Sequence, residues 1–413
     1  MKNLLLILLL VPFIISAQTY DKNNWEHLST ANGDFEVPFT GKQQTSSLVV
    51  DIDNDDIPEI FLTERTFAPS VVMYKFENNK WVRYIIDNEP LIIEAGATTW
   101  DITGNGYKDI VFGGDGSSNQ VWWWENPYPK FDRNIPWKRR YIKNGGSNKQ
   151  HDQLFGDFTG NGKGEVVFWN QGAKALMMGK IPEDVKNAVA WEYEPIYKYS
   201  SDSEMEQLGH ENYPQWKRVN EHEGLVKIDI DGDGTLDIVG GGLWFKYDGK
   251  GKFIPNIIDA RYTFSRVAAG QLIEGGRPEV VLTPGDGKAP MMLYEWRQGS
   301  RPGEGTWFGK VILNELWNAH SLDIIDFDGD GHLDLFVAEM RINGENPDAK
   351  MRVMLGDGKG NFEDQVISTG FGNHESRIVD LNGDGLYDIV GKPYNWEVPR
   401  LDIWINLGTR NSN

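Results

Sequence analysis

Short apolar runs and short acidic phrases alternate along most of this chain. The apolar runs are about five residues long and read IVFGG, VVFWN, IVGGG, LFVAE and IVGKP. Runs of this length between turn-forming residues predict buried strands rather than helices. Aromatic stretches such as VVMYKFEN and LDIWIN follow, and then stretches such as WVRYIID and FEDQVIST. The pattern therefore predicts an all-β chain with four strands in each repeat.

An acidic phrase precedes the apolar run at 51–59, 101–109, 157–165, 229–237, 326–334 and 380–388, with oxygen-bearing side chains at its positions 1, 3, 5 and 9. One tight loop can fold four such oxygens around calcium, a hard cation that prefers oxygen ligands. Position 12, where an EF-hand needs glutamate, is apolar or glycine here. We therefore expect a strand–loop–strand unit with up to six structural calcium sites. The predicted ligands are Asp51, Asp53, Asp55, Glu59, Asp101, Thr103, Asn105, Asp109, Asp157, Thr159, Asn161, Glu165, Asp229, Asp231, Asp233, Asp237, Asp326, Asp328, Asp330, Asp334, Asp380, Asn382, Asp384 and Asp388.

The phrases recur with a period that is typical of propeller blades. A decayed copy at 271–281 lacks most of the acids, so we expect no metal there. With this copy the spacings are 50, 56, 72, 42, 55 and 54 residues. Four-stranded repeats of about this length indicate a β-propeller, and seven copies predict seven blades. The segment 25–30 resembles the last strand of a repeat, so we expect it to complete the final blade and remove the open edges.

Composition and the N-terminus bound the location and the partners. Residues 1–17 hold a lysine, an apolar stretch and a small-residue end, which indicates a secretory signal cleaved near Ala17. The chain has no cysteine, and therefore neither a lipid attachment site nor a disulfide. The net charge of −20 comes largely from the acidic loops, and no basic stripe for nucleic acid is present. We expect a periplasmic or secreted monomer, without membrane insertion, whose single domain spans 18–413.

Four of the seven histidines occupy one place in the repeat. His151, His320 and His374 lie six residues before the first acid of their loops, and His222 lies seven before, next to Glu223. The loop follows the innermost strand, so six residues upstream is the other end of that strand. These positions should form a ring around the mouth of the channel, opposite the acidic loops. In the decayed repeat the place is taken by Ser265, followed by Arg266.

The ring predicts a candidate active site. The four imidazoles, Arg266, Glu223, Asp152 and Glu375 should converge in one concave pocket, which is the default place for catalysis. Two alternatives are histidines with local structural bonds and a transition-metal site, since imidazole suits zinc. The long segment 181–218 should cover this mouth. We expect substrate contacts from Tyr213, Trp216, Arg218, Glu223 and Trp317.

Over about residues 25–407 these features resemble the FG-GAP (integrin-like, VCBS) repeat family. The resemblance implies a β-propeller with calcium in the hairpin between the first two strands of each blade. It implies little about function, because adhesion proteins, lectins and carbohydrate-active enzymes share the repeat. The VWWWENPYP segment and the HDQ before an acidic loop resemble a branch of secreted bacterial propellers tied to polysaccharide use. Some members of that branch are sugar dehydratases or lyases.

We therefore expect β-elimination on uronic-acid-containing oligosaccharides, by a dehydratase or a lyase. His151 and His374 are the first candidates for base and acid. Arg266, or a metal held by the histidines, would stabilise the enolate-like charge. The alternative is a non-catalytic, calcium-stabilised propeller for glycan binding or adhesion. A glycosidase is a third possibility, with carboxylates from Asp152, Glu223 and Glu375.

Overall fold

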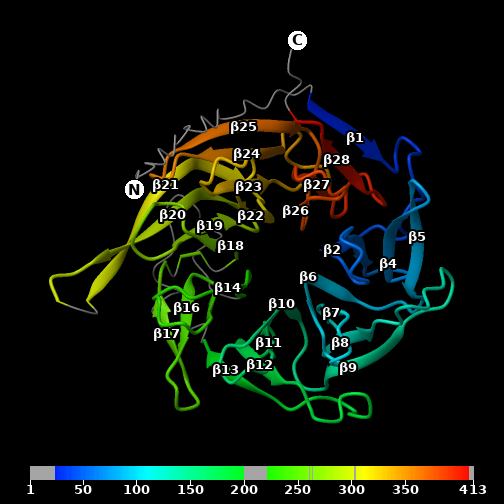
Figure 1. The fold of residues 1–413 in the computed structure, drawn as a ribbon, viewed down its shortest axis with the longest axis horizontal. Coiled ribbons are helices and arrows are strands. Elements are labelled where there is room, and N and C mark those ends of the chain that lie inside the picture. The colour runs from blue at the N-terminus through cyan, green and yellow to red at the C-terminus, as the bar shows by residue number, and fades with distance from the viewer. Residues whose placement is uncertain (1–23, 200–220, 260, 263, 302–303, 409–413) are drawn as a thin grey trace, which may run out of the picture.

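The strands form a ring of seven blades. The computed structural model describes residues 24–199, 221–259, 261–262, 264–301 and 304–408. Within these ranges there are seven four-stranded antiparallel sheets and no α-helix (Figure 1). The predicted all-β, seven-bladed propeller is confirmed.

Each of the first six blades consists of four consecutive strands. Blade 1 contains β2 (Gln44–Val50), β3 (Glu59–Glu64), β4 (Val71–Glu77) and β5 (Lys80–Asp87). Blade 2 contains β6 (Ile93–Trp100), β7 (Asp109–Gly114), β8 (Gln120–Glu125) and β9 (Lys138–Asn144). Blade 3 contains β10 (Gln150–Gly156), β11 (Glu165–Asn170), β12 (Ala175–Lys180) and β13 (Tyr193–Lys198). Blade 4 contains β14 (Val226–Ile228), β15 (Asp237–Gly240), β16 (Leu243–Tyr247) and β17 (Phe253–Ile257). Blade 5 contains β18 (Ser265–Gly270), β19 (Glu279–Pro284), β20 (Lys288–Gln298) and β21 (Gly305–Trp317). Blade 6 contains β22 (Ser321–Ile325), β23 (Asp334–Ala338), β24 (Lys350–Gly356) and β25 (Phe362–Thr369).

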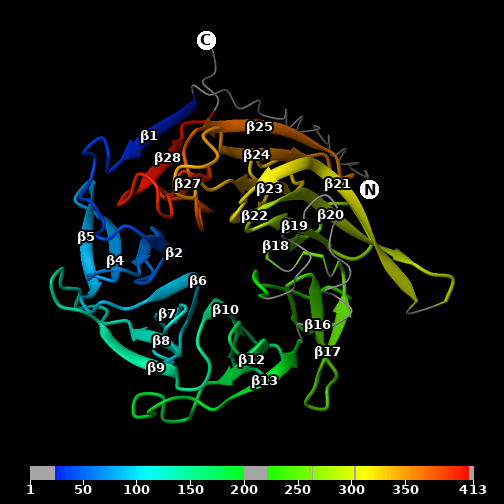
Figure 2. The ribbon, with the colours of Figure 1, turned by 180° about the vertical axis from the view of Figure 1, so that it is seen from behind.

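Blade 7 joins the two ends of the described chain. It contains β26 (Arg377–Val379), β27 (Asp388–Gly391), β28 (Asp402–Asn406) and, as its outer strand, β1 (Trp25–Ser29). The register pairs Trp25 with Asn406 and Ser29 with Asp402. Figures 1 and 2 show the blue β1 beside the red β28. Residues 25–29 therefore form the outer strand of the final blade, as the sequence predicted.

The apolar runs identified in the sequence are the second strands, and they are buried throughout. All residues of β3, β7, β11 and β19 are buried. Their side chains meet those of the neighbouring blade, so the hydrophobic cores lie between blades. One core, for example, joins Phe61 and Met73 of blade 1 to Phe112 and Trp124 of blade 2. The first strand of each blade lies nearest the centre of the ring (Figure 2).

The acidic phrases form the turns between the first and second strands, and their last acid has a structural task. The carboxylate at position 9 accepts a hydrogen bond from the backbone N–H at position 2 in all seven repeats. The decayed repeat keeps this bond, from Leu272 to Glu279 at 2.9 Å. The same bond measures 3.0 Å from Ile230 to Asp237. This loop-closing role explains why the ninth acid persists in a repeat that has lost its other acids.

Part of the long third repeat contradicts its predicted position. Residues 193–198 form the outer strand β13 of blade 3, rather than a cover over the mouth. Residues 181–192 lead into this strand, and Val185 and Trp191 are buried in the core between blades 2 and 3. Residues 200–218, and the expected signal segment 1–17, lie outside the described residues. No helix in the described part of the chain is long and apolar enough to span a membrane.

The seam between β1 and β28 provides a first prediction. Trp404 is 4% exposed, and its ring stacks on His27 of β1 with the centroids 4.7 Å apart. Truncation of a buried aromatic side chain leaves a cavity, so Trp404→Ala should lower the free energy of unfolding by about 3–5 kcal/mol. Urea unfolding followed by circular dichroism measures this. Phe67→Ala, at a side chain that is 60% exposed, should change it by less than about 0.5 kcal/mol.

Candidate functional site

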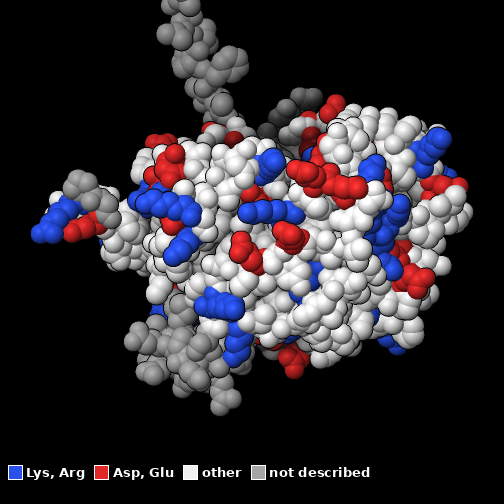
Figure 3. Space-filling view, turned by 90° about the horizontal axis from the view of Figure 1, so that it is seen from below, with Lys and Arg blue, Asp and Glu red and all other residues white. Residues whose placement is uncertain are grey.

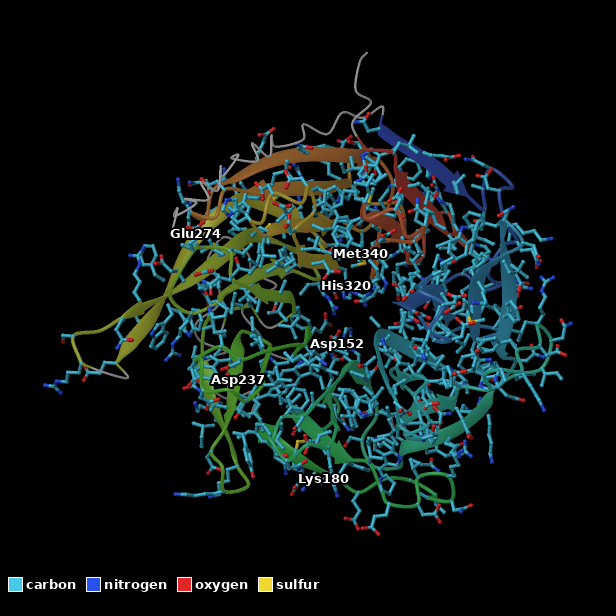
Figure 4. All side chains as sticks on the ribbon, in the orientation of Figure 1. Asp152, Lys180, Asp237, Glu274, His320 and Met340 are labelled. Carbon is cyan, nitrogen blue, oxygen red and sulfur yellow. The ribbon has the colours of Figure 1, made fainter. Side chains whose placement is uncertain are left out.

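A polar cavity lies where the innermost strands begin, on the face opposite the acidic loops. Its volume is about 240 Å³. The lining contains three histidines, five carboxylates and two cations among the described residues. They are His151, His320, His374, Glu94, Asp115, Glu221, Glu223, Asp286, Arg65 and Lys149, with Met340, Ile342 and Tyr394. Figure 4 shows His320, Met340 and Asp152 near the centre of the ring.

A repeated backbone irregularity turns neighbouring side chains toward this centre. In a regular strand, successive side chains point to opposite faces. The register of β10 shifts between His151 and Gln153, and the bulged Asp152 has a φ of 45°. Glu375 occupies the equivalent place in blade 7, with a φ of 55°. Such a bulge re-aims one side chain, so His151 and Asp152 both face the inner network.

Blade 2 approaches this bulge so closely that only glycine fits. Gly96 has a φ of 93°, and a Cβ there would lie 2.3 Å from the Cα of Asp152. Glycine has no Cβ and tolerates a positive φ. The backbone of blade 2 can therefore pack directly against the bulge that positions His151.

Arg266 ties two carboxylates together beneath the cavity. Its Nη1 lies 2.7 Å from Asp152 Oδ1, and its Nη2 lies 3.0 Å from Glu375 Oε1. Burial raises the pKa of Asp152, but the charges of Arg266 and His151 outweigh this and hold it well below its usual range. Arg266, Arg377 and His320 lower the pKa of Glu375 in the same way. Both acids therefore stay ionised.

Three ligand atoms converge above this network. The Nε2 atoms of His151 and His320 each lie 3.5 Å from an oxygen of Glu223, and the three groups offer ligand atoms within 4.8 Å of one another. Two ligands of one tetrahedral zinc ion lie roughly 3.4 Å apart. Glu223 Oε2 is buried and accepts no well-aligned hydrogen bond from the described residues. The spacing and this oxygen both fit a metal ion.

Carboxylates behind the two imidazoles fix their orientation. His151 Nδ1 lies 2.7 Å from Asp152 Oδ2, and His320 Nδ1 lies 3.3 Å from Glu375 Oε1. Metal-binding histidines usually donate their second N–H to such a group. Burial by itself would lower the pKa of each imidazole. The surrounding carboxylates outweigh burial and raise the pKa to about 10 for His151 and to about 9 for His320. The pocket therefore favours positive charge at this point, whether from protons or from a metal ion.

His374 differs from the other two histidines. Its ring stacks on His320 with the centroids 4.4 Å apart, and its Nδ1 lies 3.1 Å from Lys392 Nζ. Burial, together with the charges of Lys392 and His320, lowers its pKa well below the usual range. His374 is therefore the neutral imidazole of the cavity at neutral pH.

A pair of acids in blade 2 shares a proton. Burial and a hydrogen bond to Asp115 raise the pKa of Glu94 to about 8. Burial raises the pKa of Asp115, but the bond to Glu94 and the charge of Arg65 lower it overall. Arg65 Nη1 contacts Asp115 and lies 3.5 Å from Glu94. At neutral pH the pair therefore carries one negative charge.

The predicted convergence is correct for most of the ring and wrong for His222. That side chain is fully buried away from the cavity, against Trp169 at 4.9 Å and Tyr199 at 4.1 Å between ring centroids. It lies seven residues before its loop instead of six, so Glu223 takes the place of the fourth histidine. Arg266 lies behind the carboxylates rather than on the cavity wall, with both Nη atoms engaged.

The predicted substrate contacts have mixed outcomes. Glu223 lines the cavity. Trp317 does not, and its ring is covered by Lys288 Nζ at 4.2 Å. Tyr213, Trp216 and Arg218 lie outside the described residues.

Comparison with known proteins identifies the repeat. Residues 276–337 match the family model of the FG-GAP-like repeat. The chain is a seven-bladed β-propeller that contains an FG-GAP-like repeat. The matched stretch runs from the decayed loop of blade 5 to β23 of blade 6. A search of the curated proteins found no match.

Two solved structures resemble this propeller at low sequence identity. BBS1N, solved in complex with ARL6DN, is 8% identical, with a TM-score of 0.49 over 94% of this chain and 98% of that chain. The V. cholerae biofilm matrix protein Bap1 is 9% identical, with a TM-score of 0.38 over 85% of this chain and 77% of that one. We draw no conclusion about activity from either.

Several residues of the cavity wall were not identified from the sequence. Arg65, Asp115, Met340 and Tyr394 each lie fourteen residues after the first acid of their loops, where the second strand has ended. The second strand runs antiparallel to the first, so its end lies beside the start of the first strand. A search for polar residues at this second repeat position would have found Arg65 and Asp115.

The acidic loops contain clusters that suit a cation, but the calcium sites stay a prediction. Carboxylate oxygens lie within 4.8 Å of one another in the loops of blades 1, 4 and 6. The members are Asp51, Asp53 and Glu59; Asp229, Asp231 and Asp237; and Asp326, Asp328 and Asp334.

The network under the cavity provides a second prediction. Arg266→Gln leaves two buried carboxylates without their cation, and breaking a buried pair costs about 3–5 kcal/mol of unfolding free energy. Urea unfolding at pH 7 measures this. The loss should shrink below about pH 4, where unpaired carboxylates take up protons. Arg301→Gln, whose side chain is 80% exposed, is the control and should change the value by less than about 0.5 kcal/mol. Equal effects of the two variants would contradict the prediction.

The acidic loops provide a third prediction. Burial raises the pKa of Asp109 and Asp334 to about 7 each. Without metal, these groups contribute stability that is present below about pH 4 and lost as the pH rises through about 7. Calcium binds the ionised form, so it should raise the melting temperature more at pH 8 than at pH 5. Thermal scans with calcium or chelator measure this, with magnesium as the weaker-binding control. An equal shift at both pH values would contradict it.

Proposed function

We propose that this propeller is an exported carbohydrate-active enzyme that performs β-elimination in its central cavity, as a dehydratase or a lyase. The observation that carries the proposal is the buried cluster of His151, Glu223 and His320, which shares one small cavity with His374 and the Glu94–Asp115 pair. Titratable groups whose environments drive their pKa values apart are typical of acid–base sites. The secretory pattern at 1–17 supports action outside the cytoplasm.

The reaction needs three kinds of group. A base removes the proton on the carbon next to a carbonyl or carboxylate, the bond from the neighbouring carbon to oxygen breaks, and an acid protonates the leaving oxygen. Positive charge must stabilise the enolate-like oxygen that forms meanwhile. The cavity contains candidates for each role.

His374 is the candidate base, because its imidazole is neutral at neutral pH and can accept the proton. Glu94 is the candidate acid, since its pKa of about 8 keeps a proton available for the leaving oxygen. This assignment differs from the sequence-based pairing of His151 and His374. The high pKa of His151 makes it a poor base and a good source of positive charge.

His151, His320 and Glu223 supply the charge-stabilising role. They would hold a divalent transition metal such as zinc, which would polarise the carbonyl oxygen when bound. Asp152 and Glu375 orient the two imidazoles, and Arg266 keeps both acids in place. The pairing of Asp152 and Glu375 with Arg266 also argues against a glycosidase, because these two carboxylates do not line the cavity.

The lining bears on the charge of the substrate. At neutral pH the protonated His151 and His320 add to Arg65 and Lys149, and Glu94 keeps its proton, so the described lining has no clear excess of either charge. The lining is therefore compatible with an uncharged sugar that has a carbonyl group as well as with the uronate expected from the sequence. A substrate panel should include both classes.

An elimination assay tests the proposal. Wild type should form an unsaturated sugar from at least one member of a panel of keto-sugars and uronic-acid oligosaccharides, detected by ultraviolet absorbance and mass spectrometry. His374→Ala and Glu94→Gln should each lower kcat by about 10²–10⁴-fold, the usual contribution of general acid–base catalysis. Circular dichroism should be unchanged. His332→Ala, at a partly exposed histidine of an acidic loop, should retain full activity.

Two outcomes would overturn the proposal. Product formation that is unaffected by both cavity variants would place the chemistry elsewhere. No product from any substrate, together with retained binding on a glycan array, would favour the non-catalytic glycan-binding propeller.

A further inference from the structure

Lysine side chains enter two of the six acidic loops. In blade 1, Lys75 Nζ lies 2.9 Å from Asp53, 3.0 Å from Asp55 and 2.6 Å from Glu59. These acids occupy positions 3, 5 and 9 of the phrase. The lysine side chain is only 11% exposed. The ammonium therefore lies among three of the oxygens that were expected to bind calcium.

Blade 4 repeats this arrangement. Lys246 Nζ lies 2.5 Å from Asp231 and 2.6 Å from Asp233, at positions 3 and 5 of its phrase. Lys75 and Lys246 hold the same place in their blades. In each blade, the second residue of the second strand pairs with a residue of the third strand, and the lysine comes directly after that partner. The pairs are Ile60 with Tyr74, which precedes Lys75, and Ile238 with Phe245, which precedes Lys246. From that register a lysine stem reaches back across the blade to the loop.

The other blades differ at this register position. It is Glu125 in blade 2, Leu355 in blade 6 and Ile405 in blade 7, none of which can supply a cation. In blade 3 it is Lys180, which pairs directly with Glu165 in the strand register. Among the described residues Lys180 forms no ion pair with its loop, and Figure 4 shows it at the periphery of the ring. Lys180 is therefore a natural comparison for Lys75.

An ammonium and a calcium ion cannot share these oxygens. Both need carboxylates at close range, and two cations a few ångströms apart repel each other strongly in a partly buried site. Calcium would have to displace Lys75 from a place where it donates charge-assisted hydrogen bonds to Asp55 and Glu59 and forms an ion pair with Asp53. The phrase in blade 1 therefore has the composition of a calcium loop and already contains a cation.

We propose that the loops of blades 1 and 4 are closed by Lys75 and Lys246 in place of calcium. The protein then has at most four calcium loops instead of six, and blade 1, beside the ring seam, keeps its shape without metal. This inference does not depend on the function proposed for the central cavity. Its test uses the number of bound ions rather than activity.

The experiment counts calcium ions bound per chain. Chelator-treated protein is dialysed against buffer with a fixed calcium concentration, and bound metal is measured by atomic emission. Wild type should bind no more than four ions. Lys75→Met and Lys246→Met keep most of the stem packing, and each should bind one ion more than wild type. The double variant should bind two more, whereas Lys180→Met should bind the same number as wild type.

Two results would overturn the proposal. The first is an unchanged calcium count in folded Lys75→Met and Lys246→Met. The second comes from a test that does not depend on the folding of either lysine variant. In the otherwise wild-type chain, Asp53→Asn is expected to leave the calcium count unchanged. Loss of one ion from Asp53→Asn would show that the loop of blade 1 holds calcium beside its lysine.

Discussion

The closure of the ring is the constraint on which the rest of this structure depends. Blade 7 has only three strands of its own, and β1 from the other end of the described chain supplies the fourth. This pairing removes an open edge that would otherwise invite association. It also brings the beginnings of seven inner strands around one centre. Residues that are hundreds of positions apart, such as His151 and Glu375, thereby come to share one network.

The centre is rich in charge, and burying charge is costly unless each group is paired. Arg266 meets this requirement for Asp152 and Glu375, and these acids in turn hold His151 and His320. Arg266 occupies in blade 5 the position that Asp152 and Glu375 occupy in blades 3 and 7, so one blade supplies the cation that pairs with the acids of two others. The network orients the side chains that face the cavity. His374 remains as a neutral imidazole, and the Glu94–Asp115 pair holds a proton near neutral pH.

The acidic phrases serve two purposes that look alike in sequence. Their ninth acid accepts a backbone N–H in every repeat, including the one that has lost its other acids. In blades 1 and 4 their third and fifth residues contact a cation of the protein itself, Lys75 or Lys246. Loop closure and cation binding are therefore separable, and a loop can keep the first while the second varies between blades.

The sequence by itself determined the fold and the position of the site. Strand period and repeat spacing are local patterns that recur seven times, so the number of blades and the ring of residues six positions before each loop could be counted. Only the tertiary structure decided which side chains face the cavity. His222 lies one residue further from its acidic loop than the other three histidines. Because successive side chains of an extended chain point to opposite faces, it points into an aromatic core instead of the cavity. The bulge at Asp152, the positive φ of Glu375 and the contacts of Arg266 and Lys75 depend on the packing of blades that are remote in sequence, which no local pattern encodes.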